Sequence, residues 1–323
     1  MVDRATLIKE FLQNSPWVDW DQTPITGDAS SRRYLRLHRG DKTVILMDAP
    51  PENGEDTTKF AELAAFLNSN NLSAPKVLAH APDIGLMVIA DLGTMDFAAV
   101  LKGKPADQAT LYDAAVDVLI TLKTLSAPQG LPVMTPQVGA QMIDILGTHY
   151  TRSSVTELCA EVECALATHA PNPDTLALRD FHAENMIWRP DHKGNDRVGL
   201  LDFQDAFIAP EGYDLASLLR DVRRDIPRDV VAQTIDNYCA RTNAPANFRT
   251  QLACLGVQRN LRILGVFARL ATDHQKPRYL AFMPRVWTNI LHDLGDPALD
   301  RLKRAVLATA PPPTTDILNG LIA

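Results

Sequence analysis

The sequence has no long run of apolar residues. No stretch approaches the roughly 20 consecutive apolar residues that a membrane-spanning helix requires. The opening segment MVDRATLIKEF carries acidic charge and lacks an apolar core followed by a cleavage site. We therefore expect a cytoplasmic protein that has no membrane partner.

Cysteine is also scarce. The chain has four cysteines, at positions Cys159, Cys164, Cys239 and Cys254. Their spacing does not contain the short pairs that are typical of zinc sites, and a chain of 323 residues is large enough to fold without disulfides. We expect buried thiols.

The sequence also has no overall excess of basic residues. The formal net charge is −7, which argues against nucleic acid as a partner. The charge is unevenly distributed, because residues 220–285 contain twelve Lys and Arg against five Asp and Glu. That segment therefore carries a net charge of +7, and the remainder of the chain carries −14. A local basic region in an acidic protein favours an anionic ligand.

Composition and periodicity favour a two-part α+β protein. Apolar residues make up 46% of the sequence and charged residues 22%, as in ordinary globular proteins. An opening amphipathic helix over residues 1–14 precedes about five short strands between residues 20 and 92. A helix capped by Thr57 or Thr58 interrupts these strands. Beyond them the apolar residues recur mainly at helical spacing, with a long stripe from Leu111 to Leu125.

One hairpin places three chemically useful side chains together. Residues 186–188 and 198–201 are short apolar runs, and the polar segment between them contains Gly194. Antiparallel pairing is expected to set Asn185 opposite Asp202, so that both can hold one cation. Asp180 precedes Asn185 by five residues and is placed to act as a base. Asp and Asn are also common turn formers, but phosphoryl transfer needs such a set, and the order Asp, four residues, Asn, hairpin, Asp matches it.

The same residues carry a family resemblance. RDFHAEN resembles the catalytic loop of the protein-kinase-like phosphotransferases, and LLDFQD resembles their metal-binding segment. The sequence is similar to the aminoglycoside phosphotransferase and choline kinase group. More narrowly, it resembles the anomeric N-acetylmuramate/N-acetylglucosamine kinases of bacterial cell-wall recycling. The segments that carry this narrower resemblance, which extends from Gly27 to about Arg285, are MDAPPE (47–52), LRDFHAENM (178–186), LLDFQDA (200–206) and YDLASLLRD (213–221).

The resemblance implies a fold, a metal and a nucleotide. The fold would be protein-kinase-like, with a small antiparallel-sheet lobe over residues 1–91 and a mainly helical lobe over residues 92–323. Asp180 would be the catalytic base, while Asn185 and Asp202 would hold Mg²⁺. ATP would be the co-substrate. The implied nucleotide-binding residues are Gly27, Asp28, Ala29, Ser30, Ser31, Arg33, Ala90 and Leu92.

Two positions depart from the family pattern. The relatives carry His two residues before the catalytic Asp, where this chain has Leu178. Met47 stands where kinase-like enzymes place the strand lysine that grips the phosphates. Arg32, Arg33 or Lys42, all on the same predicted hairpin, is then left to supply the positive charge.

Sugar binding is assigned to three residues of the larger lobe. Arg259 and Arg262 share a face of a predicted helix, and no acidic residue occurs between Arg241 and Leu270. Because Arg binds carboxylates with two parallel hydrogen bonds, this pair is suited to the lactyl group of N-acetylmuramate. His182 is expected to hydrogen-bond either the sugar or its own loop. Asp214 is well placed as a helix N-cap, and in the relatives this Asp braces the catalytic loop.

Three functions are consistent with these features. The first is an ATP-dependent kinase that phosphorylates the anomeric hydroxyl of an amino sugar in peptidoglycan recycling, acting as a monomer on small molecules. The second is an aminoglycoside or choline-type phosphotransferase, although an arginine-rich lobe is unsuited to a cationic acceptor. The third is an inert kinase-like binding protein, suggested by Met47 and opposed by the intact set of Asp180, Asn185 and Asp202.

Overall fold

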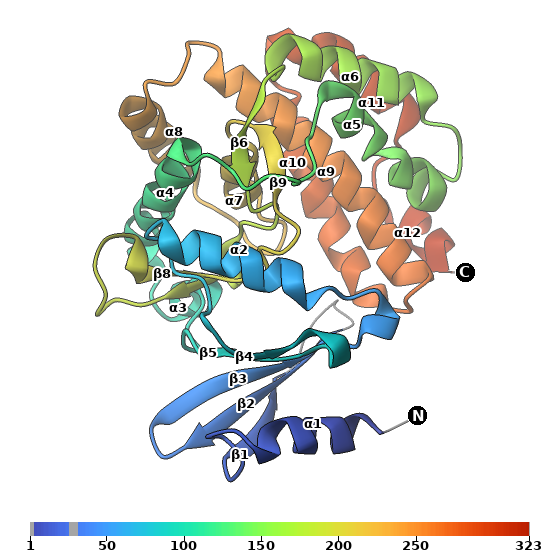
Figure 1. The fold of residues 1–323 in the computed structure, drawn as a ribbon. Coiled ribbons are helices and arrows are strands. Elements are labelled where there is room, and N and C mark those ends of the chain that lie inside the picture. Colours follow the sequence, from blue (N-terminus) through green and yellow to red (C-terminus); the bar gives the residue numbers. More distant parts are fainter. Residues whose placement is uncertain (1–2, 26–31, 323) are drawn as a thin grey trace. The chain divides into compact units, whose positions relative to one another are not determined.

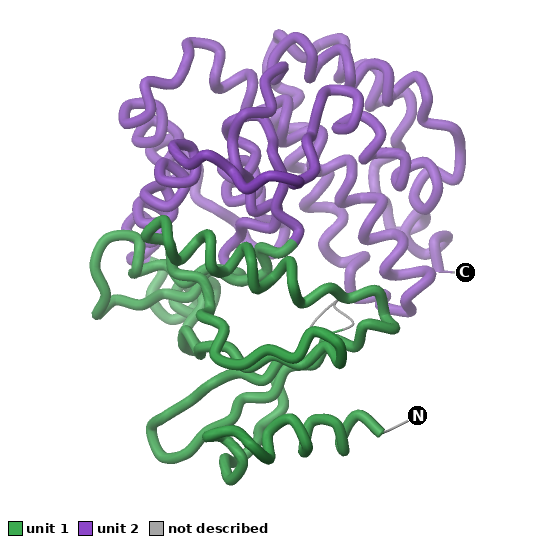
Figure 2. The backbone as a smooth tube through the Cα atoms, viewed as in Figure 1, with its two compact units in different colours: residues 1–105, 184–204 green, residues 106–183, 205–323 purple. Residues whose placement is uncertain are grey.

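The computed structural model describes residues 3–25 and 32–322, and the chain divides into two compact units (Figure 2). Unit 1 contains residues 1–105 and 184–204, and unit 2 contains residues 106–183 and 205–323. The segment from Gly27 to Ser31, predicted to bind phosphate, lies outside the described residues. The units differ from the lobes proposed at 1–91 and 92–323 because residues 92–105 and the hairpin group with the first sheet.

Unit 1 is built on a five-stranded antiparallel sheet (Figure 1). The strand order is β1-β2-β3-β5-β4, and every neighbouring pair is antiparallel. The strands are β1 (Asp21–Ile25), β2 (Arg33–Arg39), β3 (Lys42–Asp48), β4 (Val77–Ala81) and β5 (Leu86–Ala90). This sheet confirms the run of short strands predicted from the sequence.

Alternation along these strands gives the sheet two different faces. One face carries Leu37, Val44, Leu46 and Val88, which form a buried core with Leu12 of α1 (Arg4–Gln13). The predicted opening helix is therefore confirmed. Figure 1 shows α2 on the other side of the sheet from α1.

Helix α2 (Thr57–Ser69) buries the apolar stripe that its sequence predicts, namely Phe60, Leu63, Ala64 and Leu67. The expected cap, Thr57 or Thr58, was wrong, because Asp56 is the N-cap. The side chain of Asp56 accepts the backbone N–H of Thr58 at 2.9 Å, which satisfies one of the amide groups left open at the helix start. Unit 1 also contains α3 (Phe97–Gly103), capped by Asp96.

The hairpin consists of β7 (Met186–Trp188) and β8 (Val198–Leu200), and both strands belong to unit 1. Its register pairs Met186 with Leu200, and the Leu201 N–H donates to the Asn185 carbonyl oxygen at 2.9 Å. Leu201, and not Asp202, therefore lies opposite Asn185. Asp202 follows at a left-handed φ of 56°, where the chain leaves the strand. Both residues still lie at the same end of the hairpin.

Unit 2 is mainly helical. Its long helix α9 (Phe248–Thr272) spans 25 residues and buries most of its length, as expected for a helix at the centre of a core. A short pair of strands, β6 (Pro173–Ala177) and β9 (Phe207–Pro210), is antiparallel. The other helices are α4 (Gln108–Thr124), α5 (Pro136–Gln141), a π-helical turn (Leu146–Thr151), α6 (Thr156–His169), α7 (Tyr213–Leu219), α8 (Arg228–Thr242), α10 (Met283–Asp293), α11 (Asp300–Thr309) and α12 (Thr315–Ile322).

Across residues 3–25 and 32–322, we find no helix with the length and apolarity needed to cross a membrane.

The expectation of buried thiols holds only for Cys254, because Cys164 is exposed and Cys159 and Cys239 are partly exposed. The residues around each cysteine in the sequence therefore did not predict whether its thiol is buried.

Candidate active site

The predicted catalytic loop lies in unit 2 and makes two tight turns. The Asp180 N–H donates to the Leu178 carbonyl oxygen at 3.0 Å, and the His182 N–H donates to the Asp180 carbonyl oxygen at 3.1 Å. Arg179 adopts a left-handed φ of 77°, which is uncommon for a residue with a Cβ and must be held by its surroundings. The loop conformation therefore depends on its contacts.

Asp214 supplies two of those contacts. Its carboxylate accepts the backbone N–H of Leu178 at 2.5 Å and that of Arg179 at 2.9 Å. The expected N-cap role is wrong, because Gly212, with φ of 91°, caps α7 and Asp214 lies within the first turn. Asp214 instead braces the catalytic loop, which is the role the family resemblance implies.

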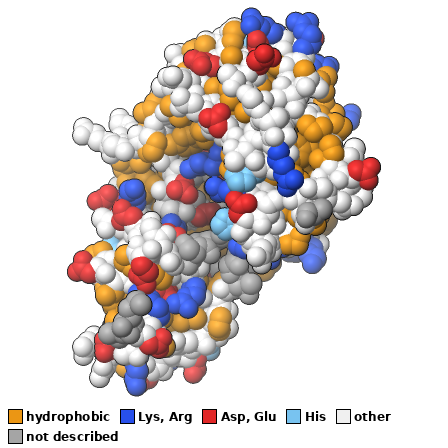
Figure 3. All heavy atoms as spheres, turned by 90° about the vertical axis from the view of Figure 1, so that its right-hand side faces the viewer, with side chains coloured by type: hydrophobic (Ala, Val, Ile, Leu, Met, Phe, Trp, Pro, Cys, Tyr) orange, Lys and Arg blue, Asp and Glu red, His pale blue; other side chains and the backbone are white. Residues whose placement is uncertain are grey.

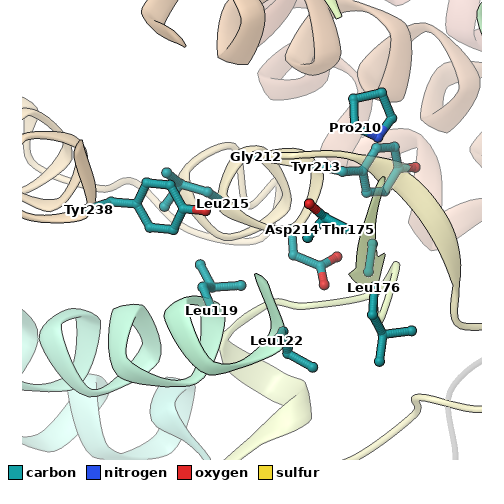
Figure 4. A pocket seen from close by; sticks show the side chains of 11 residues that line it. Leu119, Leu122, Thr175, Leu176, Pro210, Gly212, Tyr213, Asp214, Leu215 and Tyr238 are labelled. Carbon is teal, nitrogen blue, oxygen red and sulfur yellow. The ribbon is translucent and has the colours of Figure 1, made fainter. Parts of the chain in front are cut away.

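The surroundings of Asp214 are mostly apolar. The residue is 4% exposed, and its carboxylate adjoins a small cavity walled by side chains that include Leu119, Leu176 and Tyr238 (Figure 4). Burial raises the pKa of Asp214 to about 7, although the two backbone N–H donors act in the opposite direction. The brace therefore titrates near neutral pH.

We expect this shift to appear in the pH dependence of stability. The unfolded carboxyl group ionises near its ordinary pKa of 3.8, whereas the folded-state pKa is about 7. Between these values the folded state holds a proton that the unfolded state has released, so the free energy of unfolding falls as pH rises. In thermal unfolding between about pH 5 and pH 8, the native protein should lose stability relative to Asp214→Asn, which cannot titrate. A difference that is constant across this range would contradict the assignment.

The catalytic candidate Asp180 lies beside a buried arginine. The Arg259 Nη2 atom is 3.8 Å from Asp180 Oδ1, and the two side chains are 8% and 41% exposed. Asp180 is thus held on one side by a fixed positive charge and remains accessible on another. The structure brings together two residues, the candidate base and a sugar-binding candidate, that are 79 positions apart in the chain.

His182 is buried close to the same arginines. Burial, and then the charges of Arg223, Arg259 and Arg224, lowers the pKa of His182 well below its ordinary value. The imidazole is therefore neutral at physiological pH and can donate one hydrogen bond and accept another. Positive charge in this part of unit 2 comes from arginine and not from histidine.

Together, five arginines of unit 2 form what we call the basic cluster. Burial, followed by the charge of Arg179, lowers the pKa of Arg262, while Asp180 and Tyr213 act to raise it. Arg224 pairs with Asp221 at 3.5 Å. Figure 3 shows Lys and Arg side chains beside His and acidic side chains on one face of the molecule. The basic cluster is Arg179, Arg223, Arg224, Arg259 and Arg262.

Unit 1 carries the two predicted metal ligands. Asn185 is partly exposed and Asp202 is exposed, at adjoining positions beyond the paired ends of β7 and β8. The Gln204 amide donates to Asp202 Oδ1 at 2.7 Å and orients that carboxylate. Amide and carboxylate oxygens are the ligands that Mg²⁺ prefers, so this donor set fits magnesium.

The described nucleotide-binding candidates in unit 1 are Arg33, Ala90 and Leu92, and each makes contacts within this unit. Arg33 pairs with Asp48 at 2.6 Å, and Asp48 also binds Arg4. The backbone N–H of Ala90 donates to the Lys76 carbonyl oxygen at 2.8 Å, so this group is already paired within unit 1. Leu92 packs on the hairpin, where a Cβ on Gly199 would lie 2.9 Å from Leu92 Cδ1.

An ion pair between Arg32 and Glu55 was not predicted from the sequence. Arg32 Nε is 2.6 Å from Glu55 Oε2, and each side chain is 14% exposed. Arg32 was one of three candidates for the phosphate-binding charge, but Glu55 precedes α2 in a polar segment with no periodicity. Arg32 precedes β2 and Glu55 precedes α2, so the two residues meet only in the folded chain.

Comparison with known proteins identifies the family. Residues 21–249 match the model of the phosphotransferase enzyme family. An N-acetylmuramate/N-acetylglucosamine kinase from Caulobacter vibrioides is 35% identical, over 93% of this chain and 95% of the relative. A kinase of the same name from Pseudomonas aeruginosa is 29% identical, over 81% of this chain and 80% of the relative.

Solved structures share the fold at lower identity. A choline/ethanolamine kinase family protein from Mesorhizobium loti is 17% identical, with a TM-score of 0.65 over 94% of this chain and 98% of the other. A choline kinase from Streptococcus pneumoniae is 15% identical, with a TM-score of 0.67 over 89% and 98%. These likenesses confirm the predicted α+β kinase-like fold. The chain therefore belongs to the phosphotransferase enzyme family, and it is a phosphotransferase of the kinase-like fold.

Proposed function

We propose that this protein is an ATP-dependent kinase that phosphorylates the anomeric hydroxyl of N-acetylmuramate or N-acetylglucosamine. The observation that carries this proposal is the similarity, over most of the chain, to relatives that bear this name. The loop and hairpin residues expected for phosphoryl transfer are present in the same chain. The reaction would serve peptidoglycan recycling.

In the proposed mechanism, Asp180 positions the sugar hydroxyl and accepts its proton through a side-chain oxygen. Arg259 fixes the direction of that carboxylate, and Asp214 holds the loop through the Leu178 and Arg179 amides. Asn185 and Asp202 would hold Mg²⁺. When bound, this ion would supply positive charge that neutralises the phosphate oxygens of ATP.

Sugar selectivity is assigned to the basic cluster. Arg259 and Arg262 present cationic donors near Asp180, and neutral His182 can exchange hydrogen bonds with a hydroxyl or amide. A carboxylate on the acceptor suits this region, whereas a cationic aminoglycoside or choline does not. The charge therefore favours an amino sugar, with the lactyl group as the recognised anion.

We further propose the lobes 1–91 and 92–323 as functional parts, with nucleotide bound mainly by the first and sugar by the second. Backbone groups near Ala90 and Leu92 are proposed to contact adenine. We propose a cytoplasmic monomer that acts on small molecules and has no nucleic acid or membrane partner. These statements follow from the family and from the negative net charge.

A substrate screen tests the proposal. The protein would be incubated with MgATP and a panel that contains N-acetylmuramate, N-acetylglucosamine, their 1-O-methyl glycosides, choline and kanamycin. We expect ADP release with the two free sugars and none with the glycosides, because methylation removes the acceptor hydroxyl. Transfer to choline or kanamycin, or to no member of the panel, would reject the proposed acceptor.

Removal of Arg262 should change the preference between the two sugars. We expect Arg262→Gln to reduce kcat/KM for N-acetylmuramate by about tenfold or more relative to N-acetylglucosamine, because only the former presents a carboxylate. Arg249→Gln, on the exposed start of the same helix, is the matched control. Equal losses for both sugars would show that Arg262 does not recognise the carboxylate.

A further inference from the structure

The strand register of unit 1 separates the three candidate phosphate-binding cations. Paired residues of neighbouring strands share a face, so Tyr34, Met47 and Met87 lie on one face of the sheet. Arg33 pairs with Asp48 on the opposite face, where Arg4 of α1 also binds Asp48. Met47 itself is 1% exposed. The face that carries Met47 is thus the one from which a strand lysine would extend.

Lys42 lies too far along the sheet to replace that lysine. It begins β3 and pairs with Arg39, five residues before Met47. At about 3.3 Å per residue this separation is roughly 17 Å along the strand. Arg36 shares the Met47 face, but it binds Asp91 at 2.7 Å, at the far end of β5. Lys42 is therefore far from Met47, and the Arg36 guanidinium is held by Asp91 on the side of Ile45 that faces away from Met47.

Arg32 has the right face and the right neighbours. Arg32 lies immediately before β2 and its side chain hydrogen-bonds that of Tyr34, which pairs with Met47, so both side chains lie on the same side of the sheet. Arg32 hydrogen-bonds with Tyr34 as well as with Glu55. Burial raises the pKa of Tyr34, the Arg32 charge lowers it, and the charges of Asp202 and Glu55 raise it further. Arg32 and the metal-ligand candidate Asp202 therefore adjoin the same tyrosine within unit 1.

We propose that Arg32 binds the phosphates of ATP in place of the strand lysine, and that Glu55 is the acidic partner that orients it. This inference rests on the proposed ATP dependence. The guanidinium group has five N–H donors, so it can keep its contact with Glu55 while it donates two parallel hydrogen bonds to phosphate oxygens. Arginine is also always charged, so partial burial does not remove its positive charge. The absence of a lysine at Met47 is thereby compensated by the residue that immediately precedes the neighbouring strand β2.

Nucleotide binding by variants tests this inference. Dissociation constants of MgATP and of AMP would be measured by calorimetry, without sugar, for the native protein, Arg32→Gln and the matched control Arg39→Gln at the exposed end of β2. We expect Arg32→Gln to weaken ATP binding by about tenfold to a hundredfold, since a charge-assisted contact is lost. AMP binding should change little, because AMP lacks the terminal phosphates. Arg39→Gln should leave both constants unchanged.

A merely structural role for Arg32 would weaken ATP and AMP binding equally, and that result would overturn the inference. Arg32→Leu carries the same expectation as Arg32→Gln, and thermal unfolding identifies which variant folds as the native protein does. An ATP-to-AMP affinity ratio equal to the native one in a folded variant would also reject it. The proposed acceptor is judged separately, because native protein that binds MgATP but phosphorylates no sugar would reject only the acceptor.

Discussion

Asp180→Asn is expected to lower kcat by about 10²-fold to 10⁴-fold, the usual contribution of a positioned general base. Asparagine preserves the size of the side chain and can still hydrogen-bond a hydroxyl, but it cannot accept the proton. The KM for MgATP should stay close to the native value, because the nucleotide-binding candidates lie elsewhere in the chain. Steady-state kinetics with saturating MgATP and the best sugar of the screen would measure both constants.

The substitution also removes the negative charge that faces Arg259. Arg259 is 8% exposed, so its charge would lose a partner, and thermal unfolding of Asp180→Asn would establish that the variant is folded before its kcat is compared. Asp174→Asn, an exposed position on β6 of the same unit, provides the matched control and should retain native kcat. Native turnover in Asp180→Asn would show that another group accepts the proton.

Much of the fold followed from local patterns. The strands of unit 1 are short, Gly40 and Gly85 occur in the turns between β2 and β3 and between β4 and β5, and α2 buries the stripe its spacing predicts. These features depend on neighbours within a few residues, which a sequence displays directly. The boundaries were less secure. Asp56 caps α2 in place of Thr57 or Thr58, because several residues near a helix start can serve as caps and local geometry decides which one does.

The candidate site was also predicted only in part. The order of Asp180, Asn185 and Asp202 was visible as a motif, and the hairpin itself was predicted, but its register was wrong by one residue because Asp202 leaves the strand in a left-handed conformation. The pairing of Arg32 with Glu55 was not foreseen. Tertiary packing decides which residues distant in the chain form an ion pair, and the periodicity of the sequence does not predict such pairs.

Asp202→Asn is expected to have the second large effect, on both turnover and the requirement for magnesium. At the proposed metal site, the variant would keep an oxygen ligand but lose the negative charge that attracts a divalent cation. We expect the Mg²⁺ concentration for half-maximal activity to rise by about tenfold or more and kcat to fall by about a hundredfold. Activity measured across a magnesium titration at fixed free ATP would separate the two changes.

The hairpin offers a matched control for this prediction, because Asp191→Asn removes an exposed carboxylate from the loop that joins the same two strands. General loss of negative charge in unit 1 would affect both variants, whereas loss of a metal ligand would affect only Asp202→Asn. Excess magnesium should restore part of the activity of Asp202→Asn, since weaker binding is offset by concentration while the altered charge at the site persists. An unchanged magnesium requirement together with reduced kcat would mean that Asp202 serves the reaction without holding the ion.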